Sequence, residues 1–238
     1  MDSERDYPDI PIKKPIALPP SEFQKWIKKA KPKRGDKVLD PFCGTGGILI
    51  EAGRLGCTLY GSDIDEKMIE YTTKNLKHFG LEAKLKVCSI EEVENVWDIK
   101  FDAIVTDPPY RERPKILGRY LEELLKIKPR ELIQYPSVED IKKAIKDVSR
   151  LIKDFALRYP RFHFGTMGGE RIERLYRKSL DKFASLVKEG KICVIGAPEV
   201  IDFERIVKKD NTEFLHKEKI KKQIVGSIYR EVHILERC

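Results

Sequence analysis

Hydrophobic and polar positions along this chain change period repeatedly, which predicts strands that alternate with helices. Short apolar runs bounded by glycine or charged residues are typical of buried strands, whereas apolar residues three or four positions apart are typical of helices. The expected strands in the first half are residues 37–40, 58–63, 83–88 and 101–107. The expected helices are residues 21–30, with Ser21 as N-cap, 46–55 and 65–79. This alternation predicts an α/β fold with a parallel, doubly wound sheet.

The alternation breaks after residue 110. Residues 111–167 form a long connection with helical patterns of its own, so we expect a folded, basic, helical insertion. An amphipathic pattern from Ile172 to Val187 then predicts a helix that leads to a strand at 191–196.

Two further strand-like runs close the chain, at residues 212–217 and 226–235. Too few residues separate them for a crossover helix, so they predict an antiparallel hairpin. We therefore expect residues 1–238 to form a single domain with a mostly parallel, seven-stranded sheet. Residues 1–36 would supply an N-terminal arm and the first helix.

The charge of the chain is unevenly distributed. Its 47 Lys and Arg outnumber its 39 Asp and Glu, which gives a formal net charge of +8. Residues 37–110 carry −5, whereas residues 111–165 carry +6. This contrast favours a polyanion partner that touches one surface and avoids another, and solvated lysine-rich helices are the alternative explanation.

Composition excludes several protein classes. No apolar run approaches the roughly 20 residues that cross a bilayer, and the acidic start MDSERDYPDI lacks the apolar region of a secretory signal. We therefore expect a cytoplasmic protein without a membrane span. The five cysteines and four histidines are scattered without a CxxC pair, which predicts neither a disulfide framework nor a metal site.

A glycine-rich turn, DPFCGTGG at residues 40–47, lies between the first strand and a helix. Gly44 and Gly46 let the backbone turn tightly and approach a ligand, and the helix start offers free N–H groups. Asp63 ends the next strand, where a carboxylate can accept both hydroxyls of an adenosine ribose. The turn therefore predicts a nucleotide-cofactor site, with a helix cap as the alternative role of Asp63.

The details of this turn favour S-adenosylmethionine over NAD. A dinucleotide fingerprint would place Gly or Ala at the position that Leu49 occupies. An acidic residue at the start of the turn, Asp40, suits a cofactor with a positive ammonium group better than one with a pyrophosphate.

A second motif, TDPPY at residues 106–110, lies at the carboxyl end of the fourth expected strand, where ligands bind in such sheets. Pro108 and Pro109 stiffen the turn, which leaves its carbonyls and the Asp107 carboxylate as acceptors for an NH2 group. Two acceptors on the hydrogens of an exocyclic amine align its nitrogen with a methyl donor. Tyr110 offers a face on which a flat base can stack. A proline-stiffened strand exit with Tyr110 in the core is the alternative.

VLDPFCGTGGILIEA, the GSDID run and the DPPY turn together resemble the class I methyltransferases that act on exocyclic amines of nucleic acids. In particular they resemble the catalytic domain of the archaeal and eukaryotic tRNA guanine-N2 methyltransferases, which modify guanosine at position ten. The resemblance covers residues 15–110 and about 168–238, and it implies a Rossmann-like fold.

The resemblance also implies a role for individual residues. The methionine end of S-adenosylmethionine would be bound by Asp40, Gly44, Thr45 and Gly46. Asp63 would bind the ribose and Ile64 the adenine, while Asp107, Pro108 and Tyr110 would be the catalytic residues that hold the guanine.

Three features depart from the family pattern. Ser89 follows the third expected strand, beside the adenine site, where the family usually has an acidic residue. Arg111 follows DPPY, where glycine is common, and starts the basic insertion. Only about 35 residues precede the first expected strand, whereas the relatives carry a THUMP-containing region that grips tRNA.

These departures shape the expected binding of RNA. The basic residues expected to contact RNA are Arg111, Lys142, Lys143 and Lys146, of which the lysines share one predicted helix. A separate THUMP-type or activator subunit is expected as a partner in addition to tRNA.

The sequence thus predicts a metal-independent enzyme that transfers a methyl group from S-adenosylmethionine to N2 of a guanine in tRNA. Two alternatives stay open. One is an N6-adenine methyltransferase on rRNA or DNA, because the acceptor turn recognises an amine and not a particular base. The other is a catalytically silent RNA-binding subunit with the same fold.

Overall fold

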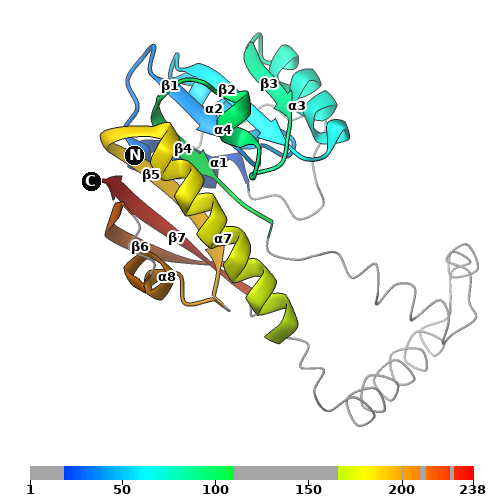
Figure 1. Cartoon of the computed structure of the whole chain (residues 1–238). Coiled ribbons are helices and arrows are strands. Elements are labelled where there is room, and N and C mark those ends of the chain that lie inside the picture. Colours follow the sequence, from blue (N-terminus) through cyan, green and yellow to red (C-terminus); the bar gives the residue numbers. More distant parts are fainter. Residues whose placement is uncertain (1–18, 110–165, 200, 210–212, 226–227) are drawn as a thin grey trace, which may run out of the picture. The chain divides into compact units, whose positions relative to one another are not determined.

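The structure, a computed structural model, describes residues 19–109, 166–199, 201–209, 213–225 and 228–238 (Figure 1). The predicted N-terminal arm and nearly all of the predicted insertion lie outside these residues. The chain divides into two units, Met1–Tyr110 with Glu173–Cys238, and Arg111–Ile172. The first unit contains the sheet described below, and the prediction of a single domain stays a prediction.

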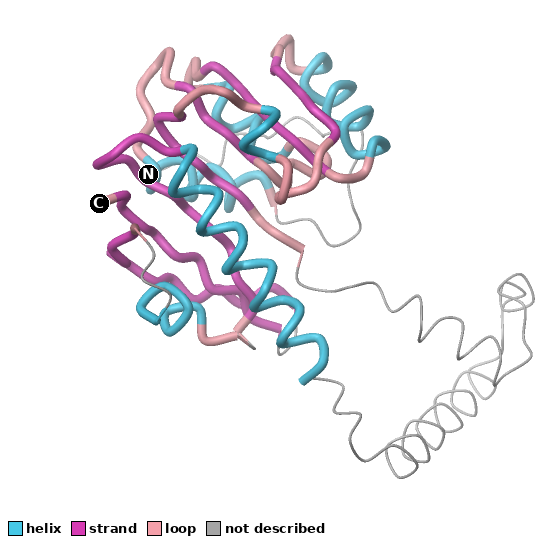
Figure 2. The backbone as a smooth tube through the Cα atoms, viewed as in Figure 1, coloured by secondary structure: helices cyan, strands magenta, loops and turns pink. Residues whose placement is uncertain are grey.

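Within the described residues, seven strands form one sheet in the order β3-β2-β1-β4-β5-β7-β6 (Figure 2). The strands are β1 (Lys37–Asp40), β2 (Thr58–Asp63), β3 (Ala83–Val87), β4 (Phe101–Thr106), β5 (Val187–Pro198), β6 (Phe214–Val225) and β7 (Ile228–Arg237). The first five strands pair in parallel, and β7 pairs antiparallel with both β5 and β6. The predicted mostly parallel sheet with a C-terminal antiparallel hairpin is therefore confirmed.

Helices cover both faces of this sheet. They are α1 (Pro20–Ala30), α2 (Gly47–Arg54), α3 (Glu66–His78), α4 (Val93–Val96), α7 (Thr166–Leu186) and α8 (Phe203–Lys209). Figure 1 shows α7 across the front of the sheet and α1 behind it. Doubly wound sheets place ligands at the carboxyl ends of their parallel strands, so this architecture directs attention to the ends of β1, β2 and β4.

The core follows the alternation of side chains along each strand. Val38, Val105 and Val194 join a buried cluster with residues of α1 and α2. Their neighbours Leu39 and Ile104 are equally buried and point to the opposite face. Both faces of the central strands are thus apolar. This explains why their sequences are continuous runs of hydrophobic residues.

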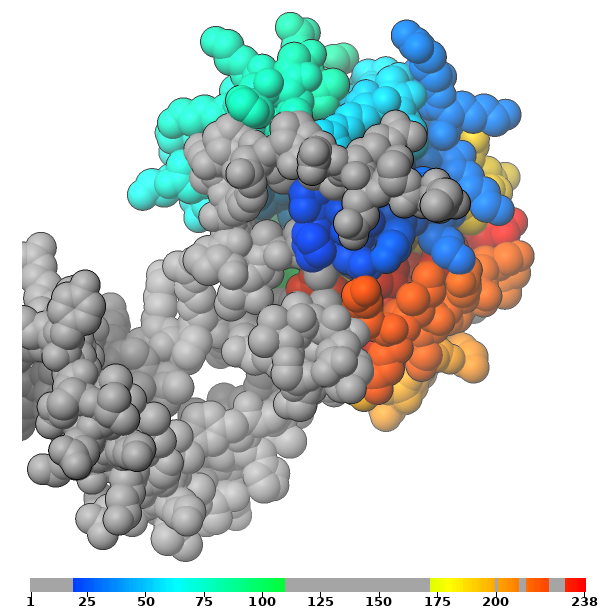
Figure 3. Space-filling view, turned by 180° about the vertical axis from the view of Figure 1, so that it is seen from behind, coloured from blue at the N-terminus to red at the C-terminus, as the bar shows by residue number. Residues whose placement is uncertain are grey.

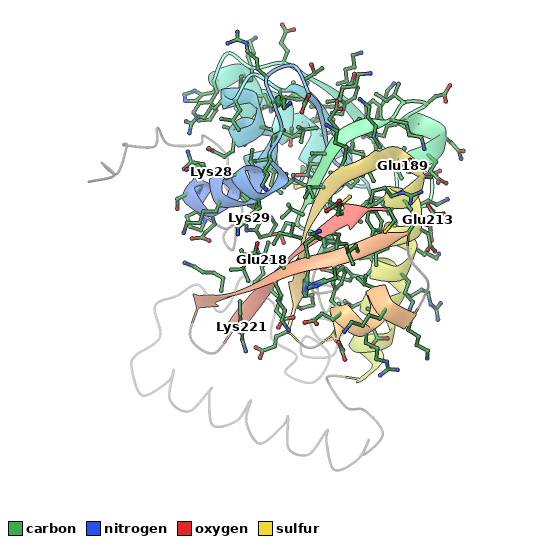
Figure 4. The ribbon with its side chains drawn as sticks, turned by 90° about the vertical axis from the view of Figure 1, so that its left-hand side faces the viewer. Lys28, Lys29, Glu189, Glu213, Glu218 and Lys221 are labelled. Atoms are coloured by element: carbon green, nitrogen blue, oxygen red, sulfur yellow. The ribbon has the colours of Figure 1, made fainter. Side chains whose placement is uncertain are left out.

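Helix α1 lies beside the edge strand β6 on the face seen in Figure 3. Lys29 donates to both carboxylate oxygens of Glu218, at 2.7 and 2.8 Å (Figure 4). Lys222 pairs with Glu22 at 3.1 Å. The exposed Lys29–Glu218 pair contributes little to stability, but a lysine-rich edge strand discourages pairing with another sheet.

The predicted boundaries of the first helix and of the helix before β5 were wrong. Ser21 does not cap the first helix, because α1 begins at Pro20 and Pro19 occupies the N-cap position. Proline fits the first helical position since its fixed φ is already helical and its missing N–H is not needed there. The second wrong boundary is at Val187, which was expected to end a helix. In the structure α7 ends at Leu186, and Val187 is the first residue of β5, paired with Phe101.

The C-terminal hairpin is longer than predicted, because β6 runs from Phe214 to Val225 instead of ending at Lys217. A register shift between His216 and Glu218 interrupts the alternation of apolar and polar residues there. The second part of the strand could therefore not be recognised from its sequence pattern. The short helices α4 and α8 were not predicted.

Candidate functional site

The glycine-rich turn after β1 has the backbone that the sequence predicts. Gly44 and Gly46 have positive φ angles of 54° and 87°. At Gly46 a Cβ atom would also lie 3.0 Å from Cγ2 of Thr72, so close packing against α3 adds to the preference of its backbone for glycine. Its role toward a cofactor stays a prediction.

Two buried side chains of α3 hold the turn in place. Thr72 donates its hydroxyl to the carbonyl of Gly44 at 2.8 Å, and Asn75 donates its amide to the carbonyl of Thr45 at 2.8 Å. Sequence reasoning missed both residues. The available signal was a pair of polar side chains, three positions apart, beside the apolar stripe of this helix.

Asp63 joins the end of β2 to the same turn. Its Oδ2 accepts from the backbone N–H of Gly44 at 2.9 Å, and its Oδ1 accepts from that of Asp65 at 3.1 Å. The N-cap of α3 is Asp65, whose side chain accepts from the backbone N–H of Lys67 at 3.0 Å. Asp63 is therefore not the helix cap that was its alternative role.

The residues expected around an adenine lie next to Asp63. Ile64 is 74% exposed, which is unusual for a large apolar side chain. Ser89 donates its backbone N–H and its hydroxyl to Oε2 of Glu92, at 3.1 and 2.8 Å, and these bonds lower the pKa of Glu92. In the motif SIEE, the carboxylate of Glu92 thus lies beside Ser89, three residues earlier in the chain. The arrangement resembles a capping box.

Asp40 lies almost completely buried at the end of β1. Its Oδ1 accepts from the backbone N–H of Phe42 at 3.1 Å and from the hydroxyl of Thr106 at 2.8 Å. Burial raises the pKa of Asp40 to about 7; these two bonds act against the rise, and the negative charges of Asp107 and Asp63 add to it. The three carboxylates therefore act on one another electrostatically at one edge of the sheet.

Asp107 follows β4 and forms an ion pair that the sequence did not predict. Nη1 of Arg230, on β7, donates to Oδ2 of Asp107 at 2.7 Å. The next residue, Pro108, is buried. The structure therefore gathers Asp40, the glycine turn, Asp63 and Asp107 at the ends of adjacent strands.

The remaining predicted site residues lie outside the described part of the chain. They are Tyr110, Arg111, Lys142, Lys143 and Lys146. Among the residues that are described, no three His, Cys, Asp or Glu side chains converge as metal ligands would, and no helix is long and apolar enough to span a bilayer.

Chemically, this edge of the sheet offers negative charge and hydrogen-bond acceptors. The carboxylates of Asp40 and Asp63 can attract a cationic ligand, whereas the charge of Asp107 is paired with Arg230, and the exposed Ile64 offers an apolar surface beside them. Asp107 can accept an N–H from a substrate amine.

Comparisons with known proteins find similarity to methyltransferases. Residues 26–126 match the family described as RMKL-like, methyltransferase domain (UPF0020). A tRNA (guanine(10)-N2)-dimethyltransferase of Methanothermobacter thermautotrophicus is 30% identical over 231 residues, which cover 95% of this chain and 52% of that protein. The Pyrococcus abyssi protein of the same name is 37% identical over 56% of this chain and 43% of its own length. The chain thus spans about half the length of the curated relatives it matches.

Solved structures agree on the fold. TrmN from Thermus thermophilus covers 93% of this chain with a TM-score of 0.60 at 18% identity, over 49% of that protein. A magnesium protoporphyrin IX methyltransferase from Synechocystis, solved with bound SAM, covers 92% with a TM-score of 0.56 at 15% identity, over 78% of its own chain. The chain therefore has a Rossmann-like fold of the kind found in methyltransferases, and nearly all of it is similar to about half the length of a tRNA (guanine(10)-N2)-dimethyltransferase.

Proposed function

We propose that this chain transfers a methyl group from S-adenosylmethionine to the exocyclic N2 amine of a guanine in tRNA. The observation that carries the proposal is the position of Asp107, in a DPP turn at the carboxyl end of β4, next to the glycine turn. The names of the relatives in two archaea supply the base and the RNA class.

The charge of the described residues suits S-adenosylmethionine, which carries a positive sulfonium and ammonium group. The raised pKa of Asp40 reflects burial among negative neighbours, and a cationic ligand would relieve that repulsion. We assign the methionine end to Asp40 and the glycine turn, the ribose to Asp63, and the adenine to Ile64 and the Ser89 turn. When bound, the cofactor supplies an electrophilic methyl group on a sulfonium.

The side chains of the acceptor site would act on the base. Asp107 accepts an N–H of the target amine, which orients the nitrogen and draws electron density toward its lone pair. Pro108 is buried and fixes the backbone of the turn. Tyr110 is proposed, from its place in the motif, to stack on the guanine.

Recognition of tRNA is proposed to involve Arg111, Lys142, Lys143 and Lys146. A single basic surface binds phosphates with little selectivity. We therefore propose that a separate THUMP-type or activator subunit raises the selectivity of the chain for tRNA. The cytoplasmic location inferred from the sequence stays a prediction.

The decisive experiment is methyl transfer by the 238-residue chain to tRNA, followed by mass spectrometry of the nucleosides. We expect N2-methylated guanosine. Asp107→Ala should lower kcat by about 10² to 10³, as removal of one preorganised polar group does elsewhere, while S-adenosylhomocysteine binding stays within about twofold of wild type. The matched control is Asp98→Ala, an exposed carboxylate before β4, which should leave both unchanged.

Other outcomes would contradict the proposal in different ways. Methylated adenosine in place of guanosine would favour the N6-adenine activity. Cofactor binding without methyl transfer to any RNA, with or without an added RNA-binding subunit, would favour a catalytically silent protein.

A further inference from the structure

Arg230 reaches the acceptor site from the far end of the sequence. β7 runs antiparallel to β5, so its first residues lie at the carboxyl edge of the parallel strands, and Arg230 is in register with Pro198 at the end of β5. The same edge holds Asp107, which follows β4. The side chain of Arg230 is only 9% exposed and that of Asp107 19%.

The pair is held in a protein environment with little water. Burial lowers the pKa of Arg230, and the negative charge of Asp107 acts against that shift. Tyr176 of α7 is fully buried nearby: its hydroxyl donates to the carbonyl of Gly196 at 2.8 Å, and its pKa responds to both Asp107 and Arg230. Removing one partner of such a pair would leave the other charge poorly compensated.

Other polar contacts hold the opposite ends of the same strands. At the opposite end of β4 and β5, Lys188 donates to Asp102 at 2.6 Å. At the opposite end of β7, Arg237 donates to the carbonyls of Ala184 and Cys238, at 3.0 and 2.8 Å. The buried guanidinium at the start of β7 is instead directed to the carboxylate of the DPP turn.

We propose that Arg230 is a positioning residue for Asp107. A carboxylate has about four lone-pair sites, and its terminal torsion is soft. The bond from Arg230 to Oδ2 fixes the plane of the carboxylate and its negative charge, so that the group is ready to accept an N–H of the target amine. This inference rests on the proposed function, because it assigns Asp107 to that amine.

The test compares Arg230→Met and Arg230→Lys with Arg237→Met in the full chain. Loss of a charge-assisted hydrogen bond predicts a fall in kcat of about 10- to 100-fold for Arg230→Met. Arg230→Lys, which keeps the charge but not the planar geometry, should recover part of that loss. Binding of S-adenosylhomocysteine, measured by calorimetry, should stay within about twofold in both variants. Arg237→Met should lower the melting temperature and leave kcat unchanged.

A double-mutant cycle decides whether Arg230 acts through Asp107. In an Asp107→Asn background, Arg230→Met should lower kcat by no more than about twofold, because the group that it positions is already altered. Additive losses, or an Arg230→Met protein with wild-type kcat, would overturn the positioning role while the proposed function stands. If Arg230→Met does not fold, an Arg230→Lys protein that matches wild type in kcat overturns it equally. A wild-type chain that methylates no RNA overturns both proposals.

Discussion

At the residue scale, Asp40 shows how burial sets the chemistry of the site. Its pKa is raised from an ordinary value of 3.8 to about 7, because little water reaches the carboxylate. The folded chain therefore holds this proton more tightly than the unfolded chain does. The resulting contribution to stability is complete below about pH 4 and is lost as the pH rises through 7.

Replacing Asp40 with Asn tests this. Asn can keep both bonds, which end on Oδ1, but carries no charge. At pH 8 we expect the variant to unfold with a free energy higher than that of wild type by on the order of a few kcal/mol, with a smaller difference at pH 5. Wild type should bind S-adenosylmethionine more tightly as the pH rises through 7, and Asp40→Asn should bind it weakly at every pH. Melting curves and calorimetry at pH 5 and 8 measure both; a pH-independent affinity would contradict the charge argument.

Some site residues could be predicted from the sequence and others could not. Asp40 and Asp63 each end a strand and Asp107 directly follows one, so local pattern and the topology of parallel sheets were enough to place them at one edge. Arg230 could not be matched to Asp107, because 123 residues separate them and no local signal records the contact.

At the element scale, α3 both packs against the core and holds the glycine-rich turn after β1 through hydrogen bonds. Thr72→Val preserves shape but removes the bond to the carbonyl of Gly44. We expect a loss of about 1–2 kcal/mol in unfolding free energy and several-fold weaker binding of S-adenosylhomocysteine. Thr73→Val is the matched control, since that exposed hydroxyl bonds only within the helix, to the carbonyl of Ile69. Equal effects of Thr72→Val and Thr73→Val in denaturant melts and calorimetry would show that the bond from Thr72 to Gly44 does not hold the turn in its binding conformation.

The strands and helices with the most regular spacing of apolar residues were predicted best. β1, β2 and β4 are short buried runs, and α3 has a regular apolar stripe, so all four were placed within one or two residues. α8 was missed because it has only seven residues, although Asp202, whose Oδ1 accepts from the backbone N–H of Arg205 at 3.0 Å, marks its start. The bulged β6 was recognised only in part, because its alternation reverses partway along.

At the scale of the whole molecule, net charge differs between residues 37–110 and the residues that follow them. Residues 37–110 carry −5 and residues 111–165 carry +6, so a nucleic acid would approach the second and avoid the first.

Charge reversal at Lys142, Lys143 and Lys146 tests this at the level of binding. We expect the triple change to Glu to weaken tRNA binding and to reduce the slope of log affinity against log salt by about 2 to 3, with cofactor binding intact. The matched control reverses three basic residues of α8, Arg205, Lys208 and Lys209. If the slope of log affinity against log salt in filter-binding titrations is unchanged, or if the control has an equal effect, the three lysines do not contact RNA and belong to a solvated surface.

The antiparallel direction of β7 has a practical consequence for such measurements. The strand begins at Ile228, beside the acceptor turn that Arg230 reaches, and ends at the opposite edge of the sheet, where Cys238 donates its backbone N–H to the carbonyl of Glu213. Cys238 is an exposed thiol, whereas burial raises the pKa of Cys43, Cys57, Cys88 and Cys193 and so suppresses their reactive thiolates. A maleimide dye would therefore attach at Cys238, where it could report binding without covering the edge of the sheet at which we propose that the substrate binds.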